Sequence, residues 1–67
     1  MKLSDYAGKK VKIVDNDNIT YQGIVFGYTK AEDNDENEAS IDVFPNKYSS
    51  NGIELFESEI RSIEVIN

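Results

Sequence analysis

Cysteine and histidine are both absent from this 67-residue sequence, and proline occurs once. Without cysteine the chain can form neither a disulfide nor a thiolate zinc site. The usual nucleophile–base pairs are missing, as are a Gly-x-Ser-x-Gly elbow and a glycine-rich phosphate loop. We therefore predict that the protein is not an enzyme and has no catalytic residues, no cofactor and no metal.

Long apolar runs are also absent, because no stretch approaches the roughly 20 residues that a membrane-spanning helix needs. The opening residues MKLSDYAGKK lack the apolar segment of a signal peptide. Both absences predict a cytoplasmic protein with no membrane partner. The length predicts a single domain, residues 1–67, with a core so small that a partner subunit would help to stabilise it.

Positive charge is scarce, since 7 lysines and arginines face 13 aspartates and glutamates and give a net charge of −6. A field of this sign repels nucleic acid over most of the surface. The basic residues are unevenly placed, however, and more than half of them fall within the first twelve positions: Lys2, Lys9, Lys10 and Lys12. A local basic patch is therefore compatible with the sequence.

Acidic residues concentrate in residues 31–40, AEDNDENEAS. Oxygen-bearing side chains alternate there as in an EF-hand calcium loop, but Glu38 stands where that loop needs glycine and Phe44 where it needs glutamate. Residues 29–32 match a helix capping box, yet no apolar stripe follows them. We interpret the segment as a mobile, solvated hairpin loop.

Apolar residues elsewhere recur with a period near two, which indicates β-strands. The expected strands cover residues 9–14, 19–28, 40–44, 53–56 and 60–66. Their connections are too short for helical crossovers, so the sheet should be mostly antiparallel. One helical turn is expected before Gly8. Within the second strand the alternation stops after Gly23, which predicts a strand that is buried on both sides or bends at this glycine to form a small five-stranded barrel.

Three segments in this order resemble the Sm-like (LSm) domain family, in the form of a small, divergent, bacterial-type member. They are GKKVKI at 8–13, YQGIV at 21–25 and EIRSIEVI at 59–66. The resemblance implies an SH3-like barrel with Sm-like topology and a short N-terminal helical turn. It also implies rings in which the fourth strand of one subunit, here 52–56, pairs with the fifth strand of the next, here 60–66.

The same resemblance implies single-stranded RNA as a partner. The sequence departs from the family pattern at two positions: Thr29 stands near the place of an aspartate, and Ser62 stands in place of a glycine. Tyrosine can stack a base, and basic side chains can contact phosphate. The candidate RNA-binding residues are Tyr28, Asn34, Asn37, Arg61 and Lys9.

Phe44 and Phe56 lie on the polar sides of their strands, where two aromatic rings would form an apolar patch. The candidate interface residues are Phe44, Phe56, Leu55, Ile63 and Val65. The leading hypothesis is a non-catalytic binding module that forms a homo-oligomer through its strand edges. Two alternatives are left open: an Sm-like RNA-binding protein, and a module that binds another protein through Phe26, Phe44 and Phe56. Glutamates on the edges would instead favour a monomer.

Overall fold

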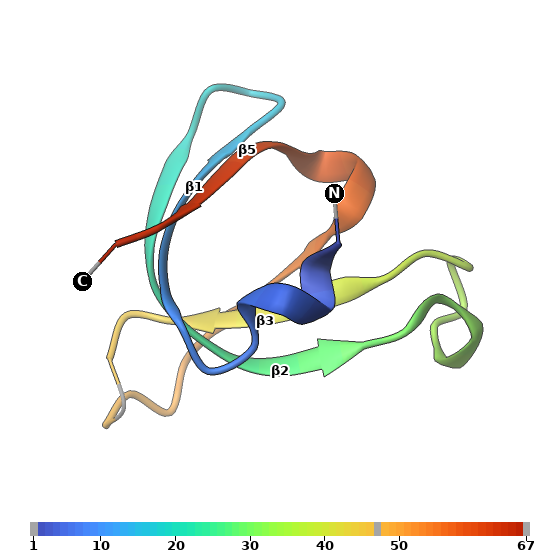
Figure 1. The fold of residues 1–67 in the computed structure, drawn as a ribbon, viewed down its shortest axis with the longest axis horizontal. Helices are drawn as coiled ribbons and strands as arrows, with labels where there is room; N and C mark the ends of the chain where they lie inside the picture. The colour runs from blue at the N-terminus through green and yellow to red at the C-terminus, as the bar shows by residue number, and fades with distance from the viewer. Residues whose placement is uncertain (1, 47, 67) are drawn as a thin grey trace.

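The structure is a computed structural model that describes residues 2–46 and 48–66 (Figure 1). It is all-β, with five strands in one sheet, short 3-10 turns and no α-helix in the described part. The strands are β1 (Lys10–Asp15), β2 (Thr20–Thr29), β3 (Ser40–Phe44), β4 (Ile53–Phe56) and β5 (Ile60–Val65). The 3-10 turns are η1 (Leu3–Tyr6), η2 (Ala31–Asp33) and η3 (Glu57–Glu59). Each predicted strand is confirmed with bounds that differ by at most one residue.

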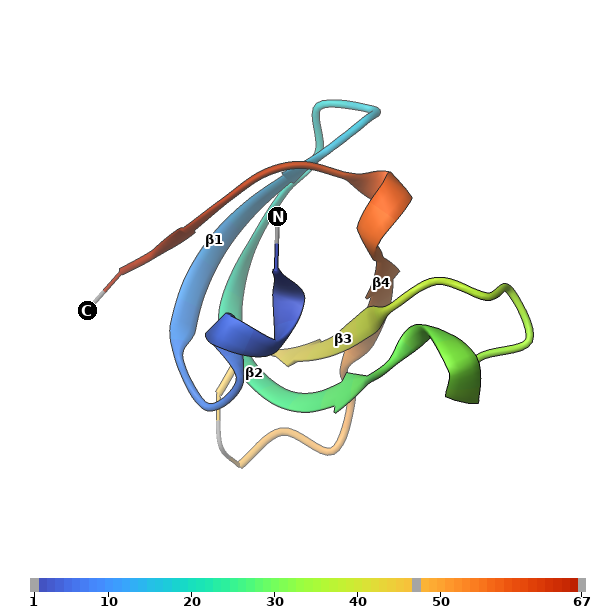
Figure 2. The same cartoon turned by 45° about the vertical axis from the view of Figure 1, so that its right-hand side comes forward.

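Neighbouring strands pair antiparallel in the order β4-β3-β2-β1-β5, which confirms the predicted antiparallel sheet. The sheet is strongly curved and η1 lies inside the curl (Figure 2). The sheet is not closed, because β4 and β5 are its two ends. The closed barrel therefore stays a prediction. Across the described ranges, no helix combines the length and the apolar character required to cross a membrane.

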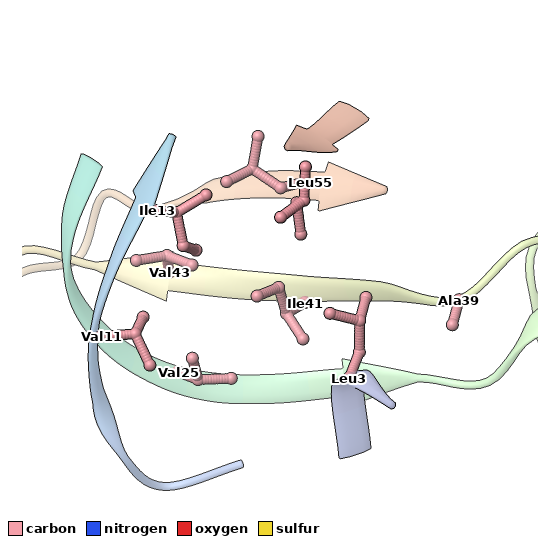
Figure 3. Packing of buried hydrophobic residues seen from close by; sticks show 9 residues of the cluster. Leu3, Val11, Ile13, Val25, Ala39, Ile41, Val43 and Leu55 are labelled. Carbon is pink, nitrogen blue, oxygen red and sulfur yellow. The ribbon is translucent and has the colours of Figure 1, made fainter. Parts of the chain in front are cut away.

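The core lies on the concave face of the sheet, where apolar side chains from the strands and from η1 point toward one another (Figure 3). Its buried apolar residues are Leu3, Val11, Ile13, Val25, Ala39, Ile41, Val43, Leu55 and Ile60. Burial of such side chains from water is the main favourable contribution to folding. Leu3 is 2% exposed, so the N-terminal turn forms part of the core.

Two features of β2 produce its bend. Gly23 lies so close to β3 that a Cβ atom there would be 2.8 Å from the carbonyl carbon of Phe44 and 3.0 Å from Val43 Cγ1. The pairing of β2 with β3 then shifts between Val25 and Gly27, which leaves Phe26 as an extra, bulged residue. The irregularity thus falls three residues after the predicted position. Phe26 is 54% exposed, so bending, and not burial on both sides, explains why the alternation stops.

The predicted turn at DNDN is organised by Asp15. Its Oδ1 accepts hydrogen bonds from the backbone amides of Asp17 and Ile19, both at 2.9 Å, and its Oδ2 accepts one from the Tyr21 hydroxyl at 3.0 Å. Asn18 adopts the left-handed conformation that asparagine tolerates, with φ 64°. The hydrogen bond from Ile19, supported by those from Tyr21 and Asp17, lowers the pKa of the Asp15 carboxyl below 3.8. The same contact raises the pKa of Tyr21 above 10.0.

Replacing Asp15 with asparagine is expected to lower the melting temperature at pH 7 by about 5 °C or more, since amides of the turn lose a charged acceptor. Folding lowers the pKa of the Asp15 carboxyl, so the carboxylate stabilises the folded chain at pH values above 3.8, its pKa in the unfolded chain. This stabilisation is lost as the pH falls through the lower pKa of the folded state. The difference between wild type and Asp15→Asn should therefore shrink below pH 4, as measured by circular dichroism melts. Asp17→Asn is the control, and a difference that does not change with pH would contradict the assignment.

Candidate functional site

An open hollow of about 700 Å³ lies beside the carboxyl-terminal end of β2. Three segments line it: the end of β2 with η2, the residues just before β3, and η3 between β4 and β5. Its lining residues are Tyr28, Lys30, Ala31, Glu32, Asn37, Glu38, Ala39, Glu57 and Ser58. The hollow is thus formed by segments that are far apart in the sequence.

Hydrogen bonds give the acidic loop before β3 a definite conformation. The side-chain amide of Asn34 donates hydrogen bonds to the backbone carbonyl oxygen of Glu38 at 2.8 Å and to Ser40 Oγ at 3.0 Å. Ser40 Oγ, on a side chain only 1% exposed, donates in turn to Glu54 Oε2 of β4 at 2.8 Å. The predicted hairpin loop thus has internal hydrogen bonds of its own, and most of its acidic side chains are solvated as expected.

A second set of contacts ties the loop to η3. The two carboxylate oxygens of Glu38 accept hydrogen bonds from the Ser58 amide at 2.8 Å and from Ser58 Oγ at 3.1 Å. The Glu57 amide donates to the Ala39 carbonyl oxygen at 2.9 Å. These bonds fix the separation of two opposite walls of the hollow.

The charge of the hollow is negative. Among the described residues Glu32 and Glu57 have no hydrogen-bond or ion-pair partner for their carboxylates, whereas that of Glu38 is occupied by Ser58. The ammonium of Lys30 lies 4.0 Å from Asp33 in an exposed pair. Within the described ranges no three acidic side chains are grouped closely enough to hold a metal ion. The hollow is therefore an acidic, aromatic-walled surface without the geometry of a metal site.

The five residues predicted to contact RNA do not converge. Tyr28 and Asn37 line the hollow together, and Tyr28 is 40% exposed. The Asn34 side chain is instead used inside the loop. Lys9 and Arg61 lie at opposite ends of β1. Lys9 comes just before the strand begins, and Arg61 is next to Ile60, which pairs with Asp15 at the end of the strand. One surface therefore collects only two of the five.

The structure brings together two of the three phenylalanines proposed for a protein contact, Phe26 and Phe44. Phe44 contacts Phe26 edge to face, with ring centroids 5.5 Å apart, because β2 and β3 place both rings on the convex face. Phe56 pairs with Ser40 at the other end of the β3–β4 ladder and does not join them. Leu55 is 5% exposed and belongs to the core, so at an interface it can offer only its backbone.

The two free edges of the sheet leave core-facing side chains partly uncovered. Ile53 of β4 pairs with buried Val43 and is 38% exposed, and Val65 of β5 pairs with buried Val11 and is 47% exposed. Ile53 also lines a smaller, mainly apolar pocket of about 200 Å³. Which strands end the sheet follows from the three-dimensional pairing and is not marked in the sequence.

Comparisons of the chain with protein-family models, curated proteins and solved structures found no match. The protein is therefore classified by its own fold and surface. It is a small all-β protein in which one curved antiparallel sheet has two unpaired edges and carries an acidic hollow beside η3.

Proposed function

We propose that the protein is a non-catalytic binding module that self-assembles by pairing β4 of one copy with β5 of the next. The partly uncovered Ile53 and Val65 carry this proposal, because their side chains face the core and yet 38% and 47% of their surfaces reach solvent. A strand added at each edge would cover them. Each copy would then complete an SH3-like barrel wall of Sm-like topology with a strand from its neighbour.

The backbone of both edges supports the same pairing. The amide of Ile66 donates to Lys10, so by alternation the amides of Ile63 and Val65 point away from β1 to the free edge. The amide of Glu57 donates to Ala39, so that of Glu54 points away from β3. Strand addition satisfies such free groups and is a common mode of protein association. A head-to-tail contact of this kind can close into a ring.

Two glutamates shape the available part of the β4 edge. Glu59 Oε1 accepts a hydrogen bond from the Phe56 amide at 2.9 Å, so pairing with a neighbour would centre on Glu54. The Glu54 carboxylate is held toward β3 by Ser40, at 2.8 Å, and so leans away from the free edge. This glutamate therefore protects the edge less than its position in the sequence suggests.

The mass of the protein in solution tests the proposal. Light scattering across a concentration series should give an assembly larger than the 7.6 kDa chain, and about five to seven copies is the size that the Sm-like resemblance implies. Added salt should not dissociate it, because apolar contacts and backbone hydrogen bonds would hold it together. A mass of one chain at every concentration up to the millimolar range would refute self-assembly.

A second candidate function is the binding of single-stranded RNA, which the shared position of Tyr28 and Asn37 in the hollow favours. Stacking of a base on tyrosine contributes about 1–3 kcal/mol. The expected result is binding of a short single-stranded RNA that weakens as salt rises. Flat titration curves at low salt would exclude it.

A further inference from the structure

We propose that the hollow beside the end of β2 binds a cationic side chain from a basic segment of another protein, with arginine as the best fit. This site is separate from the β4 and β5 edges and does not depend on self-assembly. The inference joins three properties of the hollow: its size, its aromatic wall and the placement of its unpaired carboxylates.

The size and the walls suit a long side chain with an apolar stem. The hollow is about 700 Å³ in volume and widely open to solvent, so it suits a side chain that lies along its wall and stays partly in water. Tyr28 contributes a ring that is 40% exposed, and Ala31 and Ala39 add small apolar surfaces. An arginine stem can pack along such surfaces, and its guanidinium can lie over an aromatic face.

The charges select a cation. Glu32 in η2 and Glu57 in η3 offer carboxylates without intramolecular partners on two different walls. Glu38 holds those walls together through Ser58, at 2.8 Å and 3.1 Å. A guanidinium has five donors in a fixed fork, so it can bond one carboxylate and still present donors to other acceptors of the hollow. Lys30, the one basic side chain among the described residues of the lining, lies 4.0 Å from Asp33.

Two other ligand classes fit the hollow less well. A divalent metal ion needs several oxygen ligands at about 2–2.6 Å, and no such group of acidic side chains exists among residues 2–46 and 48–66. A nucleic acid brings phosphates toward Glu32 and Glu57 within a chain of net charge −6. An organic cation on a protein is the occupant that this charge pattern complements.

The test is a titration of the full ¹⁵N-labelled chain, followed by amide chemical shifts. The probe is a ten-residue peptide in which arginine alternates with glycine, and its counterpart carries glutamine in place of arginine. We expect saturable shifts at Tyr28, Ala31, Ala39 and Ser58 with the arginine peptide alone. The double variant Glu32→Gln/Glu57→Gln should bind about tenfold more weakly.

The matched control is Asp35→Asn/Glu36→Gln, which removes two charges from exposed positions of the same loop outside the lining. It should change the affinity by less than about threefold, because charges outside the site are screened. Melting temperatures of both variants should match that of the wild type, since among the described residues the carboxylates of Glu32 and Glu57 make no internal bonds.

Any of four results would overturn the proposal: no saturable binding, equal weakening by the control variant, shifts confined to β4 and β5, or equal binding of the glutamine peptide. Saturable shifts at the same amides on titration with a ten-residue uridine RNA alone would instead assign the hollow to nucleic acid and overturn it as well. Light scattering of Glu32→Gln/Glu57→Gln should still give the wild-type mass. Failure of this site is thus distinguishable from failure of self-assembly.

Discussion

Alanine in place of Gly23 is expected to leave the chain largely unfolded. A Cβ atom at this position would overlap the carbonyl group of Phe44, with the carbonyl carbon only 2.8 Å away. These are backbone atoms of the neighbouring strand, so no side-chain rotation relieves the overlap and β2 must move away from β3. We expect a loss of about 3 kcal/mol or more, which is comparable to the whole stability of a chain this small.

The matched control is Gly27→Ala in the same strand. There the nearest obstacle is Asp42 Oδ2 at 2.6 Å, the end of a side chain that can rotate into solvent. Its cost should be about 1 kcal/mol or less. Urea unfolding and amide shift dispersion measure both variants. If Gly23→Ala is as stable as Gly27→Ala, close approach of the β2 and β3 backbones is not what requires glycine at position 23.

Proline in place of Val65 is expected to dissociate the proposed assembly while the fold is retained. The Val65 amide points to the free edge of β5, so proline removes a donor that a neighbouring strand would use and leaves the bonds to β1 intact. The dissociation constant of each interface should rise about tenfold or more. Light scattering and sedimentation should then show a falling mass as the protein is diluted.

Val65→Ile is the matched control for this variant, because isoleucine keeps both the amide donor and an apolar side chain. It should assemble like the wild type. Circular dichroism melts check that Val65→Pro still folds, as expected for a residue that is 47% exposed near the end of an edge strand. An unchanged mass for a folded Val65→Pro would show that β5 is not the assembling edge.

The strands could be predicted because apolar and polar residues alternate along a strand that is buried on one face only. Val11 and Ile13 face the core and Lys10 and Lys12 do not, and the same alternation marks β3 and the end of β5, at Ile63 and Val65. The antiparallel pairing followed from the short connections. The bulge at Phe26 could not be located, since the sequence showed that the alternation stops but not at which residue the ladder shifts.

The hollow was beyond sequence reasoning because long-range contacts build it. Glu38 meets Ser58 twenty positions further along the chain, and no local pattern marks that pair. Tyr28 and Asn37, two of the candidate RNA-binding residues, both line this hollow, whereas Glu32 and Glu57 were not among the candidates. Asn34 was predicted to contact RNA. Its side chain instead bonds the buried Ser40 hydroxyl, a contact that the sequence does not reveal.

The internal bonds of the acidic loop also tell an engineer where the chain can be lengthened. Asn34 and Glu38 are anchored to β3 and η3, whereas Asp35 and Glu36 between them are exposed and make no such bonds. An epitope or a fluorescent reporter spliced between positions 35 and 36 would therefore extend a tip that is already solvated. The same graft at position 34 or 38 would cut the tether between the loop and the sheet.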